Sequence, residues 1–384
     1  MVEHRLLIVD DDLAIHRLFS DIAQNCGYLV NTADDILSVS TVYKKFQPTL
    51  IFLDLSLTEG DGVEVLRLLS EHGCKSPIVV ISSHDDKVRA TTVRLGESRG
   101  LMMAGTFQKP IDIKTLTVIL NKYKNYGFNF NEQDIERAIK NHEFILHYQP
   151  KVLIKTKEII GAEALVRWQV PSQKNLIYPD AFIPFSEKTG SISNLSRYII
   201  QQAIKQIHEH QIDFQLSINL SGRDLTDLSL PDEIVSYVKK YRIDPAKICF
   251  EITETSVMSQ PTVAMDILTR LRIHGFELSM DDFGIGYSSL IELHRMPFSE
   301  LKIDKSFIKN LSISSDTLPI VRCIINLGKG LSLKVVAEGV ETQEAWNILE
   351  KEECHYAQGY FISQPLDISS FLDFVKKNKS STSS

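Results

Sequence analysis

The sequence predicts two α/β domains, a smaller one with a doubly wound parallel sheet and a larger (β/α)8 barrel. Its 384 residues fit one small domain and one of about 250 residues. Short apolar runs alternate with amphipathic helical stretches up to about Leu120, and eight more β-prone runs follow, most of them separated by helical stretches. Apolar residues make up 43% and charged residues 24% of the chain, which is typical of a globular protein and excludes a disordered one.

The strands of the smaller domain are predicted by short apolar runs. Helical periodicity lies between these runs, as in Ile15, Leu18, Phe19 and Ile22 and again in Val63, Leu66 and Leu69. Strands that alternate with helices imply a parallel sheet with helices on both faces. The predicted strands are Leu6–Val9, Thr49–Leu55, Pro77–Ser82 and the weaker Leu101–Gln108.

Polar residues follow these runs where the strands end, and the carboxyl ends of parallel strands are where such sheets bind ligands. They are Asp10-Asp11, Asp54, Ser82 and Lys109. Acids this close repel one another, and a hard divalent cation with oxygen ligands relieves the repulsion. The alternative is that such acids only cap the next helix, as Asp12 can. Agreement at four separate strand ends favours a site.

On these residues, the stretch from about Leu6 to Leu120 resembles a response-regulator receiver domain, a flavodoxin-like fold. The resemblance implies that Asp10, Asp11 and Asp54 hold one Mg²⁺ and that Asp54 accepts a phosphoryl group from a sensor histidine kinase. It also implies that Ser82 and Lys109 bind the phosphoryl oxygens and that Lys109-Pro110 is a cis peptide. Thr106 departs from the family pattern, which usually has an aromatic switch residue three places before the lysine; here the aromatic residue is Phe107.

The junction between the domains lies in the polar-aromatic segment Asn121 to Asn131. A new helix is expected to begin near Asn131, ahead of Ile135 and Ala138. We therefore expect a receiver domain at 1–122, a linker at 123–132, a barrel at 133–378 and a disordered tail at 379–384.

The larger domain has the size of a barrel. Helical stretches such as Leu195–Glu209, Asp232–Tyr241 and Val263–His274 separate most of its β-prone runs. The eight predicted strands are Phe144–Tyr148, Ile159–Val166, Phe214–Leu220, Ile248–Thr253, Phe276–Met280, Leu301–Asp304, Leu333–Ala337 and Tyr360–Ile362.

Acidic residues gather at the ends of these strands, where a barrel has its active site. A carboxylate amid apolar residues is costly unless it is paired or binds a metal. Oxygen ligands without clustered His or Cys favour Mg²⁺ or Mn²⁺ over Zn²⁺, and adjacent Asp281 and Asp282 indicate two ions that share a carboxylate. One or two of the acids could instead be structural salt-bridge partners. The strand-end residues are Glu163, Asn219, Glu251, Glu254, Asp281, Asp282, Lys302, Glu338 and Glu341.

The segment Phe283–Ser289 contains a Gly-x-Gly pattern that superficially matches a dinucleotide fingerprint. The third glycine of that fingerprint is replaced by Ser289, and Asp281-Asp282 precede the loop. We favour a mobile loop beside the metal ions, because glycine gives the backbone freedom.

From about Ile135 to Val375 the chain is similar to the EAL family of cyclic-di-GMP phosphodiesterases. The family fold is a modified TIM barrel whose first strand runs antiparallel. The motifs that carry this resemblance are Tyr148-Gln149-Pro150, Glu163-Ala164-Leu165-Val166-Arg167-Trp168, Asn219-Leu220-Ser221, Glu251-Ile252-Thr253-Glu254, Asp281-Asp282-Phe283-Gly284-x-Gly286-x-Ser288-Ser289, Leu301-Lys302-Ile303-Asp304, Ala337-Glu338-Gly339-Val340-Glu341 and Gln358-Gly359-Tyr360.

The resemblance implies hydrolysis of cyclic di-GMP to linear pGpG with two Mg²⁺ or Mn²⁺ ions. It implies that Lys302 orients the attacking water and that Glu338 is the general base. Glu254 would anchor the Gly284–Ser289 loop, and Glu341 would lie in an outer layer. The implied ligands are Glu163, Asn219, Glu251 and Asp281 for one ion and Asp281 and Asp282 for the other, and the implied substrate contacts are Arg167, Gln149 and Leu165.

The net charge of −7 argues against binding to DNA or to anionic membranes, which requires a basic surface. An anionic substrate would instead be received by the two ions, Arg167 and Lys302. The chain has five scattered cysteines and no C-x-x-C, no export signal, and no run of about 18 apolar residues. We therefore expect a cytoplasmic protein, and a homodimer or higher oligomer on the family resemblance alone.

Three functions remain open. The first is an active phosphodiesterase whose rate is modulated by phosphorylation of Asp54. The second is a catalytically weak EAL domain that senses cyclic di-GMP, and the third is a protein–protein signalling switch. The expected ligands and catalytic residues are all present, which favours the enzyme. We find no diguanylate cyclase signature and no DNA-binding third domain, so the expected output is a change in a second messenger.

Overall fold

The computed structural model describes residues 4–123, 131–171, 176–284, 290–309, 311 and 317–382. The chain divides into two compact units, residues 1–129 and 130–384. Within the described residues, we find no helix with the length and apolar character needed to cross a membrane.

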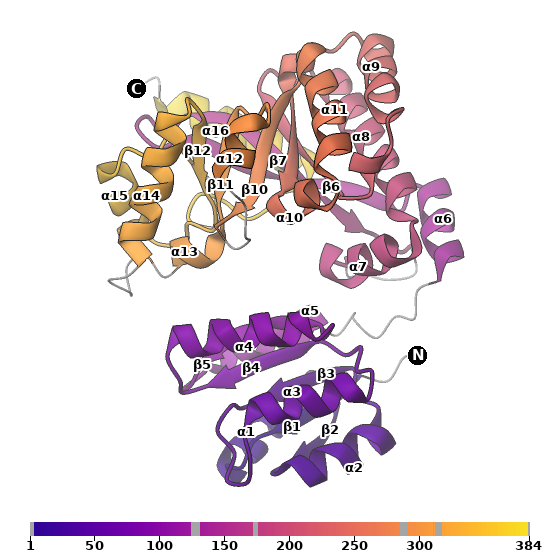
Figure 1. Ribbon diagram of the computed structural model, residues 1–384, viewed down its shortest axis with the longest axis vertical. Helices are drawn as coiled ribbons and strands as arrows, with labels where there is room; N and C mark the ends of the chain where they lie inside the picture. Colours follow the sequence, from indigo (N-terminus) through magenta and orange to yellow (C-terminus); the bar gives the residue numbers. More distant parts are fainter. Residues whose placement is uncertain are drawn as a thin grey trace. The chain divides into compact units, whose positions relative to one another are not determined.

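The N-terminal unit is a five-stranded parallel sheet in the order β2-β1-β3-β4-β5 (Figure 1). Alternate residues of a strand point to opposite faces, so Leu7 and Val9 of β1 pack in one apolar core and Leu6 and Ile8 in another. The doubly wound sheet is therefore confirmed. Its elements are β1 Arg5–Val9, α1 Leu13–Asn25, β2 Leu29–Ala33, α2 Ile36–Phe46, β3 Leu50–Leu53, α3 Gly62–Glu71, β4 Ile78–Ser82, α4 Asp86–Ser98, β5 Met103–Gln108 and α5 Ile113–Tyr123.

The edge strand β2 (Leu29–Ala33) is missing from the sequence-based prediction. It pairs only with β1 in the described sheet, and only Ala33 among its residues is buried. An edge strand that is mostly exposed needs no continuous apolar run, so the apolar pattern that identified the other four strands is absent here.

The C-terminal unit is a closed eight-stranded barrel in the order β10-β11-β12-β13-β6-β7-β8-β9. Strand β6 is antiparallel to both of its neighbours, β7 and β13, which confirms the antiparallel first strand that the family resemblance implies. The strands are β6 Phe144–Leu153, β7 Ile159–Trp168, β8 Gln215–Leu220, β9 Ile248–Thr253, β10 Glu277–Phe283, β11 Glu300–Ile303, β12 Lys334–Ala337 and β13 Tyr356–Ala357.

The eighth strand was placed wrongly at Tyr360–Ile362. Strand β13 is Tyr356–Ala357, which pairs with β12 and β6, and Tyr360–Ile362 form a turn. Tyr360 is 59% exposed, whereas Ala357 is fully buried. Aromatic residues favour strands because they fit a half-buried pleated surface. This preference cannot locate a strand that has only two residues.

Helices lie outside the barrel strands (Figure 1). Asn131 caps α6 through a reciprocal pair of hydrogen bonds with Asp134, so the helix begins where it was expected. The helices are α6 Glu132–Lys140, α7 Pro179–Thr189, α8 Ile192–Glu209, α9 Leu230–Tyr241, α10 Glu254–Ser259, α11 Pro261–Ile273, α12 Leu290–Arg295, α13 Lys305–Lys309, α14 Thr317–Gly330, α15 Gln343–Lys351 and α16 Ile368–Thr382, with short 3₁₀ helices at Asp224–Thr226 and Pro245–Lys247.

The last helix corrects the expectation of a disordered tail from residue 379. Helix α16 runs to Thr382. Asp367 precedes the helix, and its carboxylate accepts hydrogen bonds from the backbone of Ser369 and Ser370. Phe371 and Val375 of the helix are buried. A helix that is capped and packed in this way can continue into polar residues.

Candidate active site

A single lysine lies among four carboxylates at the carboxyl ends of the barrel strands. Lys302 on β11 places its Nζ 2.6 Å from Oε2 of Glu251 and 2.6 Å from Oε1 of Glu338. The same Nζ lies 3.3 Å from Oδ1 of Asp281 and 3.6 Å from Oε2 of Glu163. These residues come from β7, β9, β10, β11 and the end of β12, so the barrel brings together the acids that the sequence placed at its strand ends.

Two adjacent aspartates face this cluster because β10 is irregular. Neighbouring residues of a regular strand point to opposite faces. The register of β10 against β11 shifts between Met280 and Phe283, and Asp282 has a φ of 54°, in the left-handed region that non-glycine residues seldom adopt. As a result, carboxylate oxygens of Asp281, Asp282 and Glu338 lie within 4.8 Å of one another.

Glu163 is held by two amide side chains. Asn219 donates from Nδ2 to Oε1 of Glu163 at 2.8 Å, and Gln358 donates from Nε2 to Oε2 at 2.6 Å. The bond from Nδ2 leaves the amide oxygen of Asn219 as a possible cation ligand. Gln358 belongs to the Gln358-Gly359-Tyr360 motif, but no role for it is predicted from the sequence. Glu163 lies 195 residues before it in the sequence, and the closure of the barrel brings the two side chains together.

Burial and the surrounding carboxylates raise the pKa of several acids in the cluster. Burial raises the pKa of Glu251 to about 8, and the neighbouring Glu163 and Asp281 contribute to the rise. Burial and Asp281 raise the pKa of Asp282 to about 6, and burial also raises that of Glu338. Burial acts in the same direction on Glu163, but Lys302, Asn219 and Gln358 together lower its pKa.

The cluster fits hard divalent cations. Oε1 of Glu251 is buried and accepts no hydrogen bond within the described part of the chain. A buried carboxylate oxygen without a donor is costly, and a cation would satisfy it. The candidate ligands are all oxygens, as Mg²⁺ and Mn²⁺ prefer.

The expected substrate contacts lie further along β6 and β7. Arg167 is buried, donates from Nη1 to the carbonyl of Val166 at 2.8 Å and stacks on the ring of Tyr178 at 5.1 Å. Gln149 accepts a hydrogen bond of 3.1 Å from Gln358. Leu165, the third expected contact, is half-buried on β7.

The two outer glutamates, Glu254 and Glu341, make their contacts outside the cluster around Lys302. Glu254 begins α10, and its Oε2 accepts a hydrogen bond of 3.3 Å from the backbone of Gly284. The rest of the loop that it was expected to anchor, residues 285–289, lies outside the described residues. Glu341 instead pairs with Lys309 of α13 at 2.7 Å.

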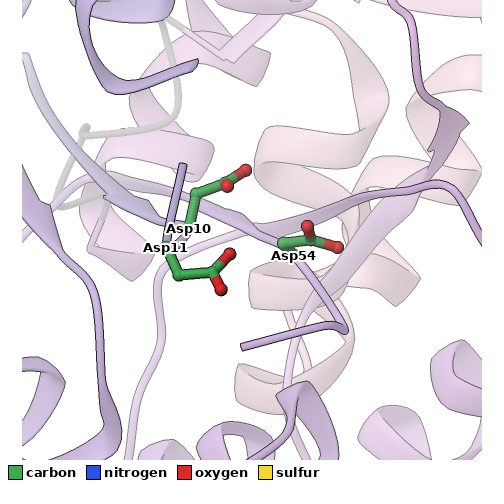
Figure 2. A group of neighbouring side chains, drawn as sticks. All are labelled: Asp10, Asp11 and Asp54. Atoms are coloured by element: carbon green, nitrogen blue, oxygen red, sulfur yellow. The ribbon is translucent and has the colours of Figure 1, made fainter. Parts of the chain in front are cut away.

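A second acidic cluster lies at the carboxyl ends of β1 and β3 in the N-terminal unit. Figure 2 shows Asp10, Asp11 and Asp54 side by side, with carboxylate oxygens within 4.8 Å of one another. Nζ of Lys109 lies 2.6 Å from Asp10 and 2.5 Å from Asp54. Burial raises the pKa of Asp10. For Lys109, burial opposes a rise, but the bonds to Asp10 and Asp54 outweigh it and raise the pKa.

The other residues expected at this site, Ser82 and Lys109-Pro110, also lie at strand ends. Ser82 ends β4, and its Oγ lies 3.0 Å from Nδ1 of His84. Thr58 donates to Asp11 at 2.5 Å. The Lys109-Pro110 peptide is cis, as the family resemblance implies. Four strand ends therefore meet at one edge of this sheet.

Comparison with known protein families identifies a domain in each of the two units. The EAL domain profile matches residues 132–365. The chain belongs to the EAL domain family. The response regulator receiver domain profile matches residues 6–121, so a receiver domain precedes the EAL domain. EAL domains are metal-dependent phosphodiesterases, and an acidic cluster of the expected kind is present in this one.

Relatives from Pseudomonas aeruginosa match one or both domains. The cyclic di-GMP phosphodiesterase RocR is 29% identical over 361 residues, which cover 91% of this chain and 92% of RocR. The bifunctional diguanylate cyclase/cyclic di-GMP phosphodiesterase MucR is 37% identical over 246 residues, which cover 63% of this chain but only 36% of MucR. The solved structure of the PaMucR phosphodiesterase in complex with c-di-GMP matches with a TM-score of 0.60 at 37% identity, and covers 62% of this chain and 98% of that one.

Proposed function

We propose that the protein hydrolyses one phosphodiester bond of cyclic di-GMP and releases linear pGpG, with a rate that phosphorylation of Asp54 modulates. The observation that carries this proposal is the buried cluster of Glu163, Glu251, Asp281 and Glu338 around Lys302. The EAL domain profile and the names of RocR and MucR support the substrate.

The EAL site would hold two Mg²⁺ or Mn²⁺ ions. Glu163, Asn219, Glu251 and Asp281 would bind one, and Asp281 and Asp282 the other. When bound, such ions polarise the phosphate and lower the pKa of a water molecule.

In this mechanism, Glu338 takes a proton from the attacking water, and Lys302 orients that water. The water oxygen forms a new bond to phosphorus while the bond from phosphorus to the ribose O3′ breaks, and O3′ takes up a proton. The Arg167 guanidinium would pair with a phosphate, for which its planar fork is suited, and Gln149 and Leu165 would contact the substrate. Burial raises the pKa of Glu338, and bound cations would lower it and favour the ionised base.

The receiver domain would take its phosphoryl group from a sensor histidine kinase. Asp54 would be the acceptor and Asp10 and Asp11 would help to hold one Mg²⁺, while Ser82 and Lys109 would bind phosphoryl oxygens. The proximity of Lys109 to both Asp10 and Asp54 supports these roles. We further propose receiver and barrel boundaries at 1–122 and 133–378, and a homodimer or higher oligomer.

The test is to incubate the protein with cyclic di-GMP and Mg²⁺ or Mn²⁺ and to measure pGpG. We expect wild-type protein to form pGpG and Glu338→Gln to be at least about 100-fold slower, as is typical when a general base is lost. Glu350→Gln, which alters an exposed carboxylate of α15, is the matched control. Binding of cyclic di-GMP without any pGpG at high protein concentration would refute the enzyme and favour a sensor.

A further inference from the structure

The inner face of the β6–β7 ribbon continues beyond the carboxylate cluster. The two strands are antiparallel, with Gln149 opposite Glu163 and His147 opposite Leu165. Residues directly opposite each other project from the same face of an antiparallel pair. Gln149 and Glu163 both bind Gln358, so they face the active site. His147 therefore lies on the same face, one step further from the cluster.

The other face of β6 packs against helices, so the residues that alternate with His147 and Gln149 point away from the active site. The hydroxyl of Tyr148 donates to Gln206 of α8, and its ring lies 5.6 Å from Phe371 of α16. The ring of Phe144 lies 5.3 Å from that of Phe182 in α7. Since Phe144, Leu146 and Tyr148 are buried and His147 is only half-buried, His147 points away from the helical layer and towards the site.

The surroundings of His147 define its hydrogen-bonding character. One ring N–H donates to the carbonyl of Pro365. Arg167 and Asp367 are its charged neighbours, and burial together with Arg167 lowers the pKa of the ring. Both effects favour the neutral imidazole. Because the nitrogen bound to Pro365 carries the proton, the second ring nitrogen is a hydrogen-bond acceptor.

We propose that His147 is a further substrate-contacting residue, whose second ring nitrogen accepts a hydrogen bond from the Watson–Crick edge of a guanine base. This inference rests on the proposed function. Guanine presents N–H donors at N1 and N2, whereas adenine has an acceptor at N1, no amino group at C2 and its donor at N6. An acceptor placed against the N1 and C2 part of the edge therefore favours guanine. A phosphate oxygen is an acceptor too, so the guanidinium of Arg167 suits the phosphate and His147 suits the base.

The experiment compares two variants of the full chain with cyclic di-GMP as substrate and cyclic di-AMP as competing ligand. His147→Gln keeps a side-chain acceptor, and His147→Leu removes it at similar size. For His147→Leu we expect KM for cyclic di-GMP to rise about tenfold and kcat to change less than about threefold, the size expected for one lost hydrogen bond to a buried group. His147→Gln should keep KM within about threefold of wild type, and the inhibition constant of cyclic di-AMP should stay unchanged in both variants. His208→Leu, at an exposed histidine of α8, is the matched control.

Equal KM values for His147→Leu, His147→Gln and wild type would overturn the inference while the proposed function stands. An equal rise for both variants would also overturn it, because the acceptor would then be irrelevant. If wild type forms no pGpG, the proposed function fails. The same comparison is then made on dissociation constants for cyclic di-GMP, where equal values for wild type and His147→Leu would overturn the inference.

Discussion

Nζ of Lys302 lies 2.6 Å from Oε2 of Glu251, and each of these side chains is 1% exposed. The same ammonium lies 2.6 Å from Glu338. Within the described cluster, Lys302 is the cation that balances several buried carboxylates. Charges removed from water in this way are tolerated only when they are paired, so the lysine and the divalent cations together would make the site stable.

Replacement of Lys302 by Met should reduce both activity and stability. Loss of the ammonium leaves buried carboxylates uncompensated, which typically costs about 3–5 kcal/mol. We expect the free energy of unfolding of metal-free Lys302→Met to fall by about that amount in urea titrations. We also expect the rate of pGpG formation to fall at least about 100-fold, as for other positioned groups that act on the reacting atoms. Lys309→Met, which removes an exposed lysine paired with Glu341, should behave like wild type. A wild-type rate for Lys302→Met would contradict the assigned role.

The stability of metal-free protein should decrease as the pH rises from 6.5 to 8. The pKa of Glu251 is about 8 in the folded protein, compared with about 4.3 for an unperturbed glutamate. Between these values the folded state holds a proton that the unfolded state has lost, so the free energy of unfolding falls with rising pH. One such group amounts to about 2 kcal/mol over this interval. The lowered pKa values of His147 and His355 oppose this trend near pH 6.5, because the unfolded chain still binds protons there at its histidines.

Urea titrations in EDTA at several pH values measure this dependence. Saturating Mg²⁺ should flatten it, because the bound carboxylates then stay ionised in the folded state. Glu251→Gln should flatten it in part. Metal-free stability that rises from pH 6.5 to 8 would show that the buried carboxylates do not carry the penalty described.

Gln358 should affect metal affinity more than the chemical step. It donates to Glu163 at 2.6 Å and to Gln149 at 3.1 Å, so it orients Glu163, a candidate metal ligand, as an outer hydrogen-bond partner. Loss of such outer partners typically weakens metal binding about 10–100-fold. For Gln358→Leu we expect the Mg²⁺ concentration for half-maximal activity to rise about tenfold, with kcat at saturating Mg²⁺ within about threefold of wild type. Gln364→Leu, an exposed glutamine nearby in sequence, is the control. A lower kcat with unchanged Mg²⁺ dependence would argue for a direct role in catalysis.

Sequence alone predicted which charged residues come together at the strand ends, because these residues interrupt buried strands. Glu251 stands between Phe250 and Ile252, and Lys302 stands between Leu301 and Ile303, and all four neighbours are apolar and buried. A charge in such a place must be paired or bind a metal. Strand β2 and the two-residue β13 have no such signal, since one is an exposed edge and the other is too short for a period to show.

Geometry that depends on local irregularity or on distant contacts could not be predicted in this way. Regular alternation would turn Asp281 and Asp282 to opposite faces. Their shared orientation depends on a register shift and on the positive φ of Asp282. No pattern of residue types in the sequence predicts either feature. Likewise, the bond between Gln358 and Glu163 exists because the last strand closes the barrel beside the first.

Phosphorylation should occur at Asp54 and should change the rate of the EAL domain. Lys109 already pairs with the Asp54 carboxylate at 2.5 Å, so the site combines the expected acceptor acid with a cation for a transferred phosphoryl group. With acetyl phosphate and Mg²⁺, we expect mass spectrometry to find one phosphoryl group on wild type and none on Asp54→Asn. The rate of pGpG formation should change at least about twofold in wild type and stay constant in Asp54→Asn, because a shift of this size needs only about 0.4 kcal/mol of coupling. Asp21→Asn, at an exposed acid of α1, should respond like wild type. Equal rates for phosphorylated and unphosphorylated wild type would show that the receiver site does not control the barrel.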